Sequence, residues 1–205
     1  MMGVFARRCL IFSMSFTPFA YIVAQVIALQ MGQDDILGPE PGKAVTWFTG
    51  EWAFNSLLLT LSVTPLRKWF GWHWILPHRR MLGLFVMFYA TLHLFSYMAF
   101  LLAWEWGDIG SELIERPYLT LGFIAWLLLI PLTLTSTKGW QRRLRRNWKS
   151  LHKLVYLIAV LAVIHYLLQI RSSWFEPTLY AVITVVLLMH RVSWDKIRSW
   201  GIDRT

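Results

Sequence analysis

Residues 81–104 read MLGLFVMFYATLHLFSYMAFLLAW, a run without acidic side chains and without Lys or Arg. A stretch of about 20 apolar residues is long enough to cross the hydrocarbon core of a bilayer as an α-helix. His93 stands near the middle of this run, and an ionisable side chain in hydrocarbon is costly enough that it usually serves a function. This single stretch therefore predicts a membrane protein with a functional histidine inside it.

Five further apolar runs flank this one, and the whole chain shares their character. The 205 residues are 57% hydrophobic and only 15% charged, which leaves too little polar surface for a soluble domain. We therefore predict an all-α integral membrane protein, a single domain over 1–205 folded as a six-helix transmembrane bundle. The run that follows Arg7 and Arg8 shows no small-residue cleavage site, which favours a retained first span over a signal peptide. The expected spans are roughly 9–31, 45–66, 81–104, 117–137, 150–170 and 173–190.

Basic residues fall almost entirely on one side of these spans. With the N-terminus in the cytoplasm, all of the 20 Lys and Arg residues except Lys43, Arg116 and Arg171 lie in cytoplasmic segments. Such a bias sets the orientation of membrane proteins, so it predicts that both termini lie inside. Most acidic residues fall on the other side, where segments 33–41 and 105–115 form an acidic face suited to docking a partner.

His93 and His165 lie at similar depths in two spans that run in the same direction. His93 is about 12 residues into the third span and His165 about 15 residues into the fifth, or roughly 18 Å and 22 Å of helix. Imidazole is the common axial ligand of haem iron, so the favoured hypothesis is one iron ligated from both sides by His93 and His165. The alternative for His93 is a structural histidine that hydrogen-bonds a neighbouring helix.

A second haem would extend this hypothesis, with His152 as its ligand. His152 lies roughly 20 Å of helix before His165, which is enough to separate two stacked haems, although steps of about 100° per residue place the two rings on different faces. The corresponding position on the third span is Arg79, so the adjacent His78 would ligate instead, or Arg79 would face a haem propionate. We therefore expect one haem and allow for a second.

Several other functions are disfavoured by what the sequence contains. The net charge of +9 does not indicate nucleic acid, because the basic residues flank apolar spans as topology signals do. The single Cys9 allows no intramolecular disulfide, and the chain has no CxxC, Gly-rich phosphate fingerprint, P-loop or obvious internal repeat. The basic run QRRLRRNWK at 141–149 is typical of an anchor to anionic membrane lipid, with a surface for flavin phosphate, haem propionate or an acidic protein as the alternative.

Several short segments carry a resemblance to a known family. They are RRMLGL at 79–84, Tyr89 with His93, WKSLHKLVY at 148–156, and HY at 165–166. Together they resemble the ferric-reductase-like transmembrane superfamily, and GEW at 50–52 and LSVTPLR at 61–67 fit it as well. The resemblance covers nearly the whole chain. The short length without an attached flavin domain resembles the haem-binding membrane subunits of the bacterial periplasmic methionine sulfoxide reductase system.

The resemblance implies a specific role. Its members hold b-type haem through histidines at the positions of His93, His152 and His165, and they are associated with FMN. They lie in the bacterial inner membrane and pass electrons from the quinone pool, or from a cytosolic flavin reductase, to a periplasmic molybdopterin-containing catalytic subunit. That partner repairs oxidised methionines in proteins, so the chain would be an electron-transfer subunit rather than the catalytic one. Arg79 replaces a fourth histidine of larger oxidase relatives.

Three other functions stay open. A stand-alone ferric or quinone reductase would act without a partner. A small proton-coupled transporter would use the intramembrane histidines as proton relays. A passive membrane anchor for an outer enzyme would need none of the histidines.

Overall fold

The computed structural model describes residues 3–33, 36–105, 107, 109–169 and 173–191. Every regular element in these residues is helical, so the all-α prediction is confirmed. The elements in chain order are α1 (Val4–Gln30), α2 (Pro41–Phe70), the 3-10 helix η1 (His73–His78), α3 (Arg79–Ser96), the π-helix η2 (Tyr97–Leu101), α4 (Ile109–Glu115), α5 (Pro117–Leu134), α6 (Lys138–Leu144), α7 (Arg146–Leu151), α8 (Leu154–Leu168) and α9 (Phe175–Met189). The predicted cytoplasmic tail after 191 and Arg171 lie outside the described residues.

Each of the six predicted spans falls on a helical segment. Four segments are long and apolar enough to cross a membrane, namely Val4–Gln30, His73–Leu101, Pro117–Leu134 and Arg146–Leu168. Helix α9 is apolar but has only 15 residues, and the 30-residue α2 contains Lys43, Glu51, Arg67 and Lys68. The described part of the chain therefore shows a multi-span helical protein, while the count of six and the orientation remain predictions.

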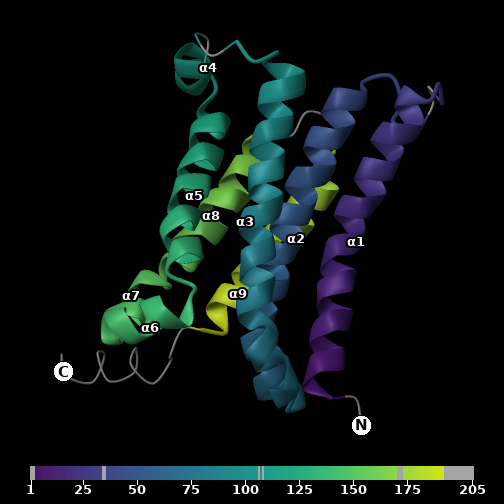
Figure 1. The fold of residues 1–205 in the computed structure, drawn as a ribbon. Coiled ribbons are helices and arrows are strands. Elements are labelled where there is room, and N and C mark those ends of the chain that lie inside the picture. Colours follow the sequence, from purple (N-terminus) through teal and green to yellow (C-terminus); the bar gives the residue numbers. More distant parts are fainter. Residues whose placement is uncertain (1–2, 34–35, 106, 108, 170–172, 192–205) are drawn as a thin grey trace.

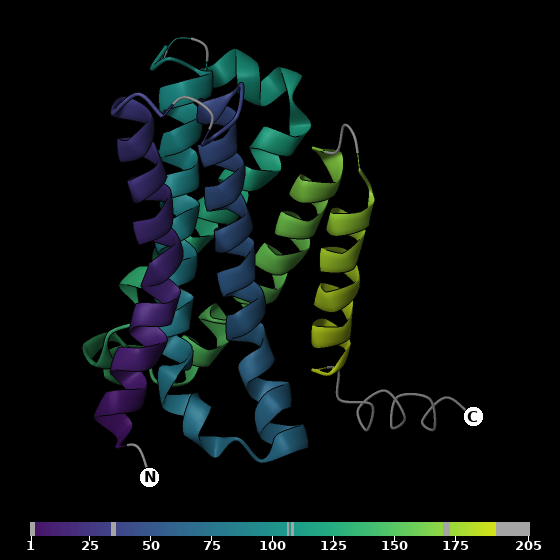
Figure 2. The same ribbon diagram turned by 90° about the vertical axis from the view of Figure 1, so that its right-hand side faces the viewer.

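The helices form a bundle in which two antiparallel hairpins stand side by side. Figure 1 shows α1, α2 and α3 next to one another, with α5 and α8 beyond them, and Figure 2 shows α8 and α9 together along one side. Helix α2 packs along α3 and α5 packs along α8, while α3 contacts α5 and α2 contacts α9. We call the end with the start of α1, the end of α2, α6 and α7 the basic end, and the end with α4 the acidic end.

The fifth predicted span differs from the observed one in a way that concerns His152. The sequence predicts one continuous helix from about 150 to 170, whereas the structure has α7, a turn at His152 and Lys153, and then α8. His152 is therefore the residue that ends α7 and not a member of the helix that carries His165. The two helices still form one apolar segment, Arg146–Leu168, that is long enough to cross a membrane, so the predicted span is interrupted at His152 rather than absent.

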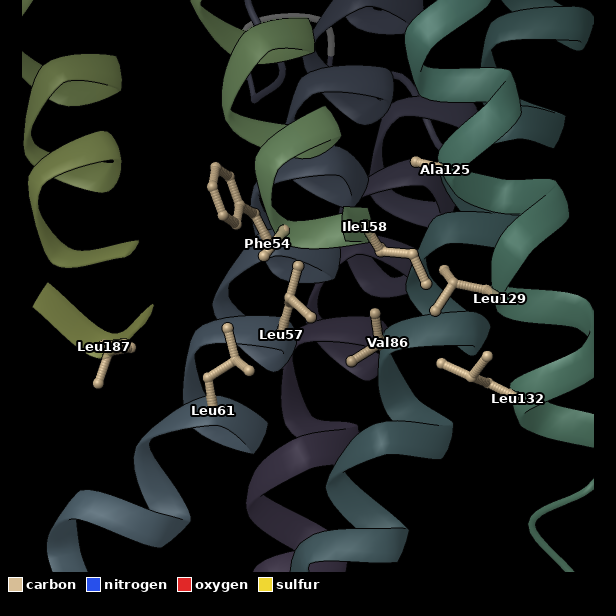
Figure 3. Close-up of a cluster of buried hydrophobic side chains, with 10 residues drawn as sticks. Phe54, Leu57, Leu61, Val86, Ala125, Leu129, Leu132, Ile158 and Leu187 are labelled. Atoms are coloured by element: carbon tan, nitrogen blue, oxygen red, sulfur yellow. The ribbon is translucent and has the colours of Figure 1, made fainter. Parts of the chain in front are cut away.

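A buried cluster of apolar side chains joins the two hairpins. It draws residues from α2, α3, α5, α8 and α9, and Figure 3 shows them converging between the helices. Small residues such as Ala125 and Ala159 let helices approach closely, which is how helices associate in a membrane, where lipid tails are as apolar as side chains. The cluster comprises Phe54, Leu57, Leu61, Val86, Ala125, Leu129, Leu132, Ile158, Ala159 and Leu187.

Candidate functional site at two facing histidines

His93 and His165 come from different hairpins and meet between them. His93 lies in the last turn of α3 and His165 in the last turn of α8. Their ring centres are 6.1 Å apart, and the ring planes meet at 80°. An iron bound by both rings through metal–nitrogen bonds of about 2 Å would hold the ring centres roughly 6 Å apart. The spacing of the two rings therefore suits a metal ligated from both sides.

Each of these imidazoles is anchored through Nδ1. The Nδ1 atom of His93 lies 2.8 Å from the Thr46 carbonyl oxygen on α2, and Nδ1 of His165 lies 2.6 Å from the Tyr118 carbonyl oxygen on α5. A carbonyl oxygen can only accept, so Nδ1 donates in both cases, and a neutral ring then keeps its lone pair on Nε2. Metal-binding histidines are usually oriented by such a bond from the other ring nitrogen. Both rings are thus fixed in the tautomer that ligates through Nε2.

The side chains near the two rings limit which metal-containing group could bind between them. Among the described residues, no group of three or more His, Cys, Asp or Glu could hold a metal ion without help. A pair of imidazoles is what a protein supplies to a six-coordinate haem, because the porphyrin provides the other four ligands. The residues present therefore fit a haem better than a bare ion.

The ring of His165 is also linked to the acidic end of the bundle. The Tyr118 carbonyl accepts the hydrogen bond from His165, and Tyr118 is two residues after Arg116. Arg116 forms an ion pair with Glu112 at 3.1 Å. Glu112 accepts a hydrogen bond of 2.8 Å from the Tyr97 hydroxyl in η2. Arg116 donates a hydrogen bond to the Tyr118 hydroxyl, and this bond, together with the charge of Glu112, raises the pKa of Arg116. Hydrogen bonds and an ion pair thus connect His165 to the acidic end, which the sequence predicts to dock a partner.

His152 is not brought to this pair. It stacks on Trp148 with ring centres 4.0 Å apart, and Trp148 donates through Nε1 to the Thr135 carbonyl at the end of α5. The Nδ1 atom of His152 is buried and has no hydrogen-bond partner among the described residues. His152 therefore lacks the orienting bond that the other two rings share, and it stands at the basic end.

The weaker candidates His78 and Arg79 also lie at the basic end, where α3 begins. His78 is only 3% exposed and is a buried residue of η1. Arg79 contacts the Tyr156 hydroxyl, to which Arg191 donates at 2.9 Å. Sequence reasoning gave Arg191 no role beyond topology, because nothing local shows that the end of α9 returns to the start of α3.

The fold and the histidine pair together define a class of protein. It is the class of all-helical membrane proteins in which two imidazoles from separate helices face each other within the bundle. The chain belongs to the family described as "Ferric reductase like transmembrane component", which matches residues 49–163. That segment includes His93 and His152 and ends just before His165.

Curated relatives cover almost the full chain. The "Protein-methionine-sulfoxide reductase heme-binding subunit MsrQ" of Xanthomonas euvesicatoria pv. vesicatoria (strain 85-10) is 45% identical over 197 residues, which is 96% of this chain and 90% of the relative. The protein of the same name from Rhodospirillum rubrum is 45% identical over 157 residues, 76% of each chain. These relatives confirm the resemblance predicted from the sequence. No solved structure matches the chain significantly.

Proposed function

We propose that this protein is the haem b membrane subunit that passes electrons to a protein-methionine-sulfoxide reductase. The observation that carries the proposal is the pair of facing imidazoles, each anchored through Nδ1 and 6.1 Å from the other. The names of the relatives, which describe haem-binding subunits of that reductase, support the same function. The chain itself would conduct electrons, and the catalytic subunit would reduce the sulfoxide.

His93 and His165 would be the axial ligands of the principal haem. A bound haem would supply one-electron redox chemistry. The protein residues hold the two Nε2 lone pairs in place, because the Thr46 and Tyr118 carbonyls fix both rings. Both histidines are partly buried between the helices, and the carbonyl bonds raise the basicity of both rings.

The basic end would hold any second cofactor. His152 is the proposed ligand of a second haem, with His78 or Arg79 opposite it, and FMN belongs to the proposal through the family resemblance. Arg79 and Arg191 both contact Tyr156 there, and two guanidinium groups beside a phenol suit a propionate or a phosphate. The missing Nδ1 partner of His152 makes this second ligand less well supported than the first pair.

The proposed path of electrons runs between the two ends of the bundle. The donor would be the quinone pool or a cytosolic flavin reductase, and the acceptor a periplasmic molybdopterin-containing subunit, across a bacterial inner membrane. The charges support this orientation, because the basic end holds Arg67, Lys68 and the α6–α7 segment, and the opposite end carries Glu112 and Glu115.

The deciding experiment is a reduced-minus-oxidised visible spectrum of detergent-purified protein, with haem quantified per chain. We expect a six-coordinate b-type spectrum. His93→Ala and His165→Ala should each lower the haem content at least roughly tenfold, because each removes one of the two axial ligands. His73→Ala is the matched control, since His73 is exposed in η1 and should retain the full spectrum. The His152→Ala variant should lose only the part of the haem, if any, that exceeds one per chain.

Two results would count against the proposal. Full haem content in His93→Ala or His165→Ala would remove the ligand assignment. A colourless wild type from haem-supplemented cells would favour proton transfer or packing for the histidines. A stand-alone ferric or quinone reductase is the second candidate, favoured by the family match, and it predicts reduction of ferric chelates by the purified protein without a partner.

A further inference from the structure

Two glycines lie directly against the two facing imidazoles. A Cβ atom built on Gly50 of α2 would lie 2.9 Å from both Cε1 and Nδ1 of His93. A Cβ atom on Gly122 of α5 would lie 2.8 Å from the same two atoms of His165. These separations are shorter than carbon atoms tolerate, so any side chain at either position would push the ring away from the helix.

The two contacts repeat one local design. In both hairpins the histidine Nδ1 bonds to a carbonyl oxygen that is 47 residues earlier in the chain. In both, the glycine under the ring follows that carbonyl by one helical turn, Thr46 to Gly50 and Tyr118 to Gly122. Each ring therefore lies over one turn of the neighbouring helix, with its nitrogen on the carbonyl and its edge on the glycine.

The hairpins correspond in their cores as well. Hairpin α2–α3 and hairpin α5–α8 run in the same directions, as Figure 2 shows. Leu57 and Leu129 occupy corresponding positions and are 2% and 6% exposed, and Val86 and Ile158 correspond with 4% and 2%. The arrangement is a structural repeat, although few residue types are shared between its halves.

We propose that Gly50 and Gly122 are a matched pair of positioning residues that set the place and the angle of the two axial imidazoles. The inference rests on the proposed haem function for the iron, but the placement of the rings holds without it. Glycine is unfavourable inside a helix compared with alanine, so two glycines in mid-helix need a compensating role. Here that role is to let each ring approach the helix backbone closely enough for Nδ1 to reach its carbonyl.

The test uses two alanine variants and two glycine controls. Gly50→Ala and Gly122→Ala should each weaken haem retention roughly tenfold, as changes to the groups that orient a ligand do. Each should also shift the midpoint potential and the ferric low-spin EPR signal. Gly83→Ala is the control for the substitution itself, because its Cβ would make only an ordinary 3.8 Å contact with Thr60.

Gly42→Ala controls for disturbed packing. Its Cβ would lie 2.6 Å from the Phe100 Cβ, a closer clash on the same helix but away from the imidazoles. We expect both controls to keep the haem spectrum and potential of the wild type. Equal haem loss in Gly42→Ala and Gly50→Ala would show a general packing effect and overturn the proposal. Wild-type haem properties in both Gly50→Ala and Gly122→Ala would overturn it as well.

A second readout separates this inference from the proposed function. In protein prepared without haem, ¹⁵N-histidine NMR reports the Nδ1–H groups directly. Gly50→Ala should shift the His93 Nδ1 resonance and leave His165 unchanged, and Gly122→Ala should do the reverse. If the wild type binds no haem, the proposed function fails, and this pairwise response alone decides whether the glycines position the rings. Unchanged resonances in both variants would reject the positioning role.

Discussion

Histidine residues in this chain differ most in what their Nδ1 atoms contact. Those of His93 and His165 donate to backbone carbonyls, whereas those of His152 and His190 are buried without a partner among the described residues. A ring anchored at one nitrogen presents the other in a fixed direction, and that property singles out the pair.

The angle between the two anchored rings gives a spectroscopic prediction. The planes of His93 and His165 meet at 80°, and near-perpendicular imidazoles give ferric low-spin haem a strongly anisotropic EPR signal. We therefore expect a large maximum g value in frozen oxidised protein. A rhombic signal of the kind that parallel imidazoles give would contradict the ring geometry while leaving the identity of the ligands intact.

At the scale of elements, a buried phenol links helix α1 to the bundle beside the aromatic contacts that Phe12 and Phe19 make with α3. Tyr89 of α3 is fully buried, its hydroxyl donates to the Ser15 carbonyl at 2.6 Å, and the Phe19 N–H donates to it at 3.2 Å. These two backbone groups are one helical turn apart. The phenol therefore bridges α1 beside Pro18, which lacks the N–H for a helical hydrogen bond. α1 has few other polar ties to the bundle in the described residues.

Tyr89→Phe should loosen α1 without affecting the haem site. Losing the two hydrogen bonds should lower stability by about 1 kcal/mol, which a thermal melt in detergent would detect as a lower transition temperature. Tyr21→Phe on α1 is the control, because Tyr21 is 53% exposed and its ring, which the substitution keeps, makes the contact with Phe48 of α2. An unchanged melting temperature in Tyr89→Phe would mean that α1 packs through apolar contacts alone.

At the scale of the whole molecule, the two ends of the bundle have opposite charge character. The basic residues of α6 and α7 lie at one end, with the start of α1 and the end of α2, and α4 with Glu112 and Glu115 lies at the other. The histidine pair is joined to this acidic end through Tyr118, Arg116 and Glu112. Electron transfer toward an outer partner would therefore leave the bundle on the side of α4.

Cysteine labelling tests this orientation. Cys9 is the single cysteine, so Cys9→Ser gives a background free of thiols. In that background, Glu115→Cys should react with a membrane-impermeant thiol reagent on intact spheroplasts, whereas Lys149→Cys should react only after permeabilisation, because the two exposed positions lie on opposite sides. The reverse pattern would invert the proposed topology, and labelling of both would show that the bundle does not span as proposed.

The sequence determined the class of fold and nominated the central histidines. Long apolar runs and the placement of Lys and Arg are local properties, so the predicted spans fall on the observed helices, apart from the break at His152. His93 and His165 were recognisable from the sequence, because placing an ionisable side chain inside a membrane costs free energy whichever helix packs against it.

Only the tertiary structure decided which groups meet. The carbonyls of Thr46 and Tyr118, the glycines beneath the rings, and the return of Arg191 to Tyr156 join segments that are distant in the chain. No residue pattern marks a backbone carbonyl as a hydrogen-bond partner, and a glycine in an apolar helix has the same letter whether it faces lipid or a ligand. Such contacts depend on how helices rotate and cross when they pack, and hydrophobicity fixes the existence of a membrane helix more strongly than its rotation.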